Sequence, residues 1–235
     1  MRHKGKRLRQ AYADINQNIS YLLEEGIKLI KAKATARFNE TIEIAMNLGV
    51  DPRHADQMVR GMVSLPHGSG KVIRVAVFAT GQQAQEAQKA GADIVGNEDL
   101  AELIQGGQIN FDRCIAAPET MVIVAKLGKI LGPRGLMPNP KLGTITPHIA
   151  EAVRTAKAGS VTFRVERAGI IHGIIGKASF SDHALIENLC TFVDAIQRAK
   201  PTGAKGTYIQ SVILSSTMGP SLKLDLNSIK NAPTH

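Results

Sequence analysis

The stretch VIRVAVF, at residues 72–78, decides the fold class of this 235-residue sequence. It is a nearly continuous apolar run, as expected of a strand that is buried on both faces. The elements expected after it are apolar runs at 92–95 and 114–116, and helices at 82–90, at 98–105, from 118 onward and from 146 to 158. This alternation of strands and helices predicts right-handed βαβ units, and hence a small parallel sheet with helices on both faces.

The sequence on either side of this region has a different pattern. Residues 41–48 alternate between polar and apolar side chains, which predicts a half-buried strand. The other expected elements are a helix ending near Ala34, a short helix from Asp51-Pro52 to about Arg60, a strand at 63–65, a hairpin at 161–180 with cations on one face, an amphipathic helix capped by Ser181, and a closing hairpin with its tip at 217–220.

The change of pattern predicts two domains. Residues 1–67 and 160–235 are expected to form one discontinuous α+β domain, and residues 68–159 an α/β domain inserted into it. Two connections would join them, near 66–70 and near Gly159. A glycine-containing double connection permits one domain to swing against the other.

Composition narrows the class of protein. No apolar run approaches the roughly 20 residues that a membrane span needs, so a soluble protein without a membrane partner is expected. Cys114 and Cys190 stand in apolar runs, where buried thiols in a reducing, cytoplasmic setting are expected. Aromatic residues make up only 4% of the chain, which argues against base stacking as the main mode of binding, whereas the net charge of +9 indicates an anionic partner.

Two basic segments could meet that partner. The segment 126–143 carries Lys126, Lys129, Arg134 and Lys141 without an acid, and after Gly132 its glycines and prolines predict an irregular surface loop. Such a loop suits a polyanion, although a connection that is merely stiffened by prolines has the same pattern. The first nine residues hold the cations Arg2, Lys4, Lys6, Arg7 and Arg9, which fit a basic arm and a disordered, solvated terminus equally well.

Motifs for catalysis are missing from the sequence. The run Gly68-Ser69-Gly70-Lys71 lacks the first glycine and the hydroxyl of a phosphate loop, and it precedes its strand. Neither GxGxxG, HExxH, GxSxG nor a Cys/His spacing typical of metal sites occurs. No catalytic residue, metal or cofactor is expected, so the chain is interpreted as a non-enzyme. A nucleotide-binding or phosphometabolite-binding enzyme and a free translational repressor are the alternative functions.

Three long motifs give a more specific indication. They are NLGVDPRHADQMVRGMVSLPHGSGK at 47–71, LGKILGPRGLMPNPKLGTIT at 127–146 and STMGP at 216–220. Together they resemble the L-one family of ribosomal proteins, and the likeness covers nearly the whole chain. The resemblance implies a discontinuous α+β domain of the split β-α-β type with an inserted Rossmann-like parallel α/β domain. It also implies a structural constituent of the large ribosomal subunit, in the cytoplasm, that binds large-subunit rRNA at the mobile side stalk and is a monomer when free.

Two finer functions and a set of residues follow from the same resemblance. The functions are assistance to deacylated tRNA leaving the exit site and repression of the protein's own operon through its mRNA. The primary RNA-binding residues implied are Arg37, Phe38, Glu40, Thr41, Arg164, Arg167, His172, Lys177, Ser211, Thr217, Met218 and Gly219. Segment 126–143 is expected to be a secondary RNA contact. Cations would meet phosphates and hydroxyls would meet ribose, while Phe38 has a place in the core as its alternative.

Overall fold

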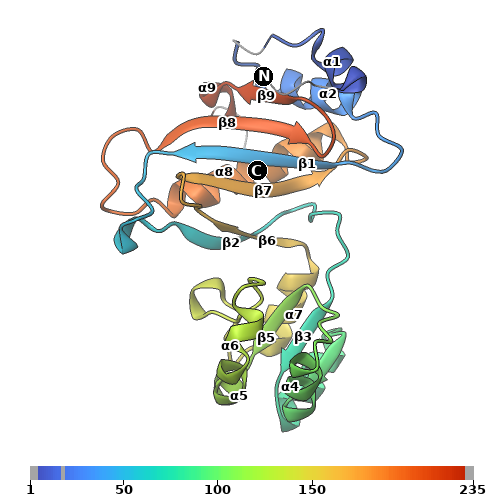
Figure 1. The fold of residues 1–235 in the computed structure, drawn as a ribbon, viewed down its shortest axis with the longest axis vertical. Helices are drawn as coiled ribbons and strands as arrows, with labels where there is room; N and C mark the ends of the chain where they lie inside the picture. Colours follow the sequence, from blue (N-terminus) through green and yellow to red (C-terminus); the bar gives the residue numbers. More distant parts are fainter. Residues whose placement is uncertain (1–4, 17–18, 231–235) are drawn as a thin grey trace. The chain divides into compact units, whose positions relative to one another are not determined.

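The computed structural model describes residues 5–16 and 19–230, without the side chains of Lys141 and Lys230 (Figure 1). The cations Arg2 and Lys4 of the predicted arm lie outside the described residues. The chain forms two compact units: one runs up to Gly70 and resumes at Val161, and the other is Lys71–Ser160. No helix of the described ranges is long and apolar enough to cross a membrane.

The larger unit is built on a four-stranded antiparallel sheet with the order β7-β1-β8-β9. Its strands are β7 (Ile170–Lys177), β1 (Thr41–Leu48), β8 (Ile209–Ser216) and β9 (Ser221–Leu224). Apolar residues of β1 at every second position are buried against helices α2 (Leu23–Lys33) and α8 (Asp182–Arg198), which cover one face of the sheet. The intervening polar residues therefore lie on the opposite face, which we call the open face.

The smaller unit contains a parallel three-stranded sheet with the order β4-β3-β5. Its elements are β3 (Val75–Phe78), α3 (Gly81–Lys89), β4 (Ile94–Gly96), α4 (Glu98–Gln105), β5 (Arg113–Ala116), η2 (Pro118–Thr120), α5 (Met121–Lys126), α6 (Gly128–Leu131), η3 (Pro140–Leu142) and α7 (Ile149–Lys157). Alternate residues of β3 enter two apolar clusters, one shared with α4 and α5 and one shared with α3 and α7. Both faces are thus covered, and the predicted mixture of an α+β fold with a parallel α/β insertion is confirmed.

The remaining elements of the larger unit correct one predicted hairpin. They are α1 (Lys6–Tyr12), η1 (Ala55–Gln57), β2 (Arg60–Ser64), β6 (Ser160–Arg164) and α9 (Leu226–Lys230). Strand β6 pairs with β2 in a two-stranded sheet, and Val165, which follows β6, forms an isolated bridge with Ile171 of β7. The predicted hairpin at 161–180 is therefore wrong in its pairing, because β6 and β7 belong to different sheets and are joined by a short turn after Val165.

Two other predicted boundaries are wrong. The expected helix after Asp51-Pro52 is only the single turn η1, since the Asp51 carboxylate accepts a hydrogen bond from the Arg53 N–H at 3.0 Å and closes a local turn. Strand β3 begins at Val75, and Val72 is 91% exposed. Both cysteines are buried free thiols, as predicted.

Candidate nucleic-acid interface

The first part of the candidate interface joins the start of β1 to the turn at 217–219 between β8 and β9. The Thr41 N–H donates to the Thr217 hydroxyl at 2.9 Å, and the Thr217 N–H donates to the Thr41 carbonyl at 3.0 Å. Lys177, at the end of β7, donates from Nζ to the Thr41 hydroxyl at 2.8 Å. Three predicted residues from distant parts of the chain thus form one hydrogen-bonded unit, which we call the β1 tip.

Glu40 is the buried centre of the β1 tip, with only 2% of its surface exposed. Its carboxylate accepts hydrogen bonds from the backbone N–H groups of Ala36 and Met218, each at 2.9 Å, and from the Ser216 hydroxyl at 2.7 Å. Burial raises the pKa of Glu40, but these donors and the charge of Arg7 outweigh burial and hold the pKa below its usual 4.5. Glu40 therefore holds the surrounding backbone in place from its buried position, because its oxygens are occupied by protein donors.

Side chains around Glu40 face solvent. Phe38 is 55% exposed and Met218 is 50% exposed, so the core position considered for Phe38 is wrong. Arg37 is also exposed, in the loop between α2 and β1. A Cβ on Gly219 would overlap the Ser216 hydroxyl oxygen, so a glycine lets the turn pack closely on the Glu40 network. The exposed surface of the β1 tip therefore consists of Arg37, Phe38, Met218 and the backbone of the turn.

His172 and Ser211 lie on the open face of the sheet, further along β1. Ala45 of β1 is paired with His172, and Asn47 is paired with Ser211. The His172 ring nitrogen Nε2 lies 3.6 Å from the Glu166 carboxylate. The pairing places both predicted residues on the same face as Thr41, because side chains alternate along a strand.

Arg164 and Arg167 are at the other end of β1. Leu48 N–H donates to the Gly169 carbonyl at 2.9 Å, which fixes the turn between β6 and β7 beside the last residue of β1. Thr41 and Leu48 are seven residues apart, or about 23 Å along the strand. The predicted primary residues are therefore not one contiguous cluster: they follow the whole length of β1.

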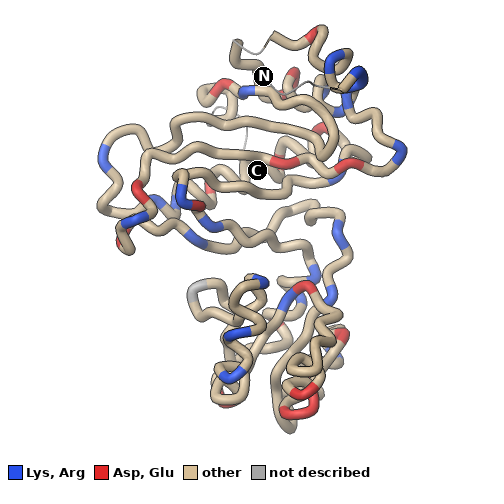
Figure 2. Tube along the Cα trace, in the orientation of Figure 1, with Lys and Arg blue, Asp and Glu red and all other residues tan. Residues whose placement is uncertain are grey.

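Both arginines line a depression of about 700 Å³, together with Pro52, Arg53, Met58, Val165 and Glu166. Arg164, Arg167 and Arg53 are exposed, and Figure 2 shows basic positions gathered in this part of the larger unit. Sequence reasoning missed Arg53, although it lies within one of the quoted motifs. We call these three residues the arginine end of β1.

Arg7 is a second residue that sequence reasoning missed as part of the site. It lies on α1, whose basic positions appear in Figure 2, and donates from Nη2 to the Met218 carbonyl at 3.1 Å. The basic arm was predicted without a specific role. The described part of it is a helix with one cation directly against the β1 tip.

The basic segment of the smaller unit is ordered by its apolar residues. Leu127 and Leu131 are fully buried, while Lys126, Lys129 and Arg134 are exposed on α5, on α6 and in the loop after α6. The loop is irregular after Gly132 except for η3, as the prolines and glycines predict. Of Lys141 only the backbone is described. Three of the four predicted cations thus face solvent from one short segment.

The fold and these positions agree with a comparison against known families. The model of the Ribosomal protein L1p/L10e family matches residues 30–220, which include every residue predicted from the sequence for the primary and secondary surfaces. The match spans far more than half of the chain. The chain therefore belongs to the Ribosomal protein L1p/L10e family, a family of structural, non-enzymatic proteins that bind rRNA in the large ribosomal subunit.

Proposed function

We propose that this chain is a bacterial member of the family that works in the cytoplasm and binds the mobile side stalk of large-subunit rRNA. The observation that supports this most is the β1 tip, where a cation, two exposed apolar side chains and a turn backbone lie around the buried Glu40. Protein–RNA recognition combines phosphate, ribose and base contacts, and each of these groups suits one of them. The chain is proposed to be a monomer when free.

The two proposed domains make different contacts with the rRNA. We assign the primary surface to the domain of residues 1–67 and 160–235, because all twelve candidate residues fall within it. The inserted domain, residues 68–159, adds a secondary contact through Lys126, Lys129, Arg134 and Lys141. Phosphate contacts by exposed cations raise affinity without reading sequence.

Filter binding to a stalk-type rRNA fragment tests the primary surface. The slope of log K against log salt should lie at about −3 to −6, since several phosphates are contacted, and matched DNA should bind much more weakly because it lacks the 2′-hydroxyl. A flat salt response, or equal affinity for DNA, would contradict the proposal.

A shortened chain tests the division between domains. When residue 67 is joined to residue 160 by a short glycine linker, the product should keep most of its rRNA affinity. Loss of all binding by a folded product, judged by circular dichroism, would reverse the assignment of primary and secondary surfaces.

Two further activities are part of the proposal: assistance to deacylated tRNA leaving the exit site, and repression of the operon that encodes the protein. Repression requires that the operon mRNA competes with the rRNA fragment for the same surface. Competition filter binding should show mutual displacement, and Met218→Asp should weaken both RNAs together, because an anion would then face phosphate. An mRNA that binds without displacing rRNA would contradict repression through this site.

Ribosomes reconstituted without the chain should release exit-site tRNA more slowly.

A further inference from the structure

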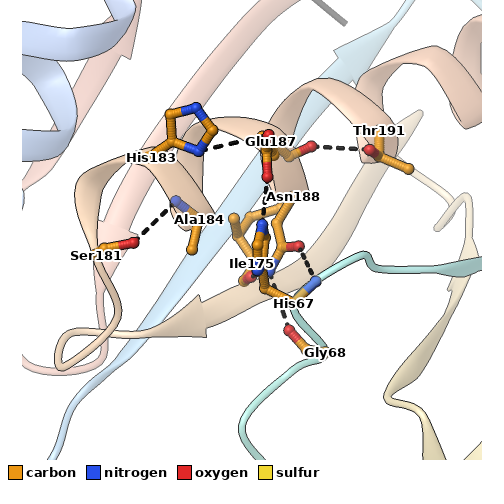
Figure 3. Close-up of polar contacts among 9 residues, drawn as sticks. All are labelled: His67, Gly68, Ile175, Ser181, His183, Ala184, Glu187, Asn188 and Thr191. Carbon is orange, nitrogen blue, oxygen red and sulfur yellow. Dashed lines mark hydrogen bonds and ion pairs between the residues drawn. The ribbon is translucent and has the colours of Figure 1, made fainter. Parts of the chain in front are cut away.

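Two histidines and one carboxylate, none of them a candidate RNA-binding residue, form a cluster at helix α8 (Figure 3). His183 and Glu187 are one turn apart on α8, and His67 comes from the segment that follows β2. The His67 nitrogen Nε2 is hydrogen-bonded to Glu187 Oε2, and His183 Nδ1 lies 3.4 Å from Glu187 Oε1. The ligand atoms of all three residues lie within 4.8 Å of one another.

The backbone of His67 is held in place independently of its imidazole. Asn188, which is fully buried on α8, accepts a hydrogen bond from the His67 N–H at 3.0 Å. Its amide nitrogen donates to the carbonyls of Gly68, at 3.0 Å, and Ile175, at 2.7 Å. Asn188 thus ties the segment to both α8 and β7. The backbone positions of the three ligand residues are therefore fixed by the fold, and their side chains converge from these positions.

Imidazole and carboxylate are the ligands that first-row divalent metal ions take in sites with three protein ligands and an open position. The side chains of His67, Glu187 and His183 are 41%, 25% and 74% exposed, so an ion can reach them from solvent. We propose that His67, His183 and Glu187 bind one Zn²⁺ or a similar divalent transition-metal ion. The ion would replace the direct contacts that the two imidazoles make with the Glu187 carboxylate.

Such an ion would act on the connection between the two compact units. His67 directly precedes Gly68 and Gly70, which have positive φ angles of 66° and 70°, and the smaller unit begins at Lys71. Coordination would therefore bond the start of this connection to α8. Sequence patterns give no sign of the site, since His67 stands 120 residues before Glu187.

Calorimetric titration of the untagged, metal-free full-length chain with Zn²⁺ tests the proposal. One Zn²⁺ should bind per chain, and His67→Ala, His183→Ala or Glu187→Gln should each weaken binding by about tenfold or more. The control is His54→Ala, because His54 is an exposed histidine near a single carboxylate, that of Asp51 at 3.9 Å. That variant should bind as the unchanged chain does.

Several results would overturn the proposal. If no Zn²⁺ binds stoichiometrically, the three residues form only a hydrogen-bonded triad. If His54→Ala loses as much binding as the other variants, Zn²⁺ binds to exposed histidines in general and not to this cluster. His183→Ala removes a largely exposed side chain, so this variant should stay folded, as judged by circular dichroism. If His67→Ala unfolds, the Zn²⁺ affinity of His183→Ala tests the proposal. Zn²⁺ should also slow tryptic cleavage after Lys71; binding without such protection would overturn the effect on the connection.

Discussion

The two ends of β1 hold their candidate RNA residues in different ways. At the β1 tip, hydrogen bonds from three separate segments converge on Thr41 and on the buried Glu40. At the arginine end, Arg164 and Arg167 are exposed cations with no ion pair to any acid in residues 5–16 and 19–230. Hydrogen bonds within the protein therefore fix the shape of the β1 tip, whereas no described acid holds the two guanidinium groups at the arginine end. Substitutions at the tip should lower stability and affinity together, whereas those at the arginine end should lower affinity alone.

Glu40→Ala should have the largest effect on the β1 tip. The change leaves the N–H groups of Met218 and Ala36 and the Ser216 hydroxyl without their acceptor. Buried donors without partners cost about 1–3 kcal/mol each, and partial access of water should bring the total loss of unfolding free energy to roughly 2–4 kcal/mol. Urea unfolding measures the loss, and rRNA affinity should fall with it. Glu43→Ala, an exposed carboxylate on the same strand, is the matched control and should change stability little.

The same carboxylate predicts a pH dependence. Because the folded protein holds the pKa of Glu40 below 4.5, the folded state binds its proton less readily than the unfolded chain does. The stabilisation is therefore complete above about pH 4.5 and is lost as pH falls through the folded pKa. Glu40→Gln should have a shallower loss of unfolding free energy as the pH falls below about 4.5. Parallel curves for the two proteins would show that Glu40 does not stabilise the tip as an anion.

Gly219→Ala should have the next largest effect. The added Cβ would overlap the Ser216 hydroxyl oxygen, and that hydroxyl is a donor to Glu40, so the turn must shift. Overpacking of this kind costs about 1–3 kcal/mol, measurable as a lower thermal midpoint. Gly128→Ala is the control, because a Cβ there meets nothing within 4 Å in helix α6. It should leave the midpoint unchanged or raise it.

Thr217→Val should lower stability by about 1 kcal/mol, since it removes a hydroxyl that bonds the Thr41 backbone in the folded protein. Thr217→Ser keeps the hydroxyl and should retain most of that stability. Unfolding in urea compares the three proteins. If Val and Ser variants were equally stable but differed in rRNA affinity, the hydroxyl would act on RNA and not on the tip.

How far the sequence predicted this structure depends on the range of the interactions involved. The strand at 41–48 and the Ser181 cap were predicted correctly, because alternation and capping are local patterns. The divergence of β6 from β7 was missed, since it depends on the pairing of β6 with the distant β2. The candidate residues came from a resemblance between motifs, and the sequence could not show that Glu40 is buried under the tip. Neither could it place Arg7 beside Met218, 211 residues away.

Arg164→Ala and Arg167→Ala should have the smallest effect on stability and so separate the two ends of β1 most clearly. Both side chains are exposed, so unfolding free energy should change by less than about 0.5 kcal/mol. If each arginine neutralises one phosphate, each change should reduce the magnitude of the salt slope of rRNA binding by about 1. Lys205→Ala, an exposed cation in the loop before β8, should leave the slope unchanged. A slope that stays constant in both arginine variants would confine RNA binding to the β1 tip, and a comparable drop for Lys205→Ala would mean that the whole basic surface acts without distinction.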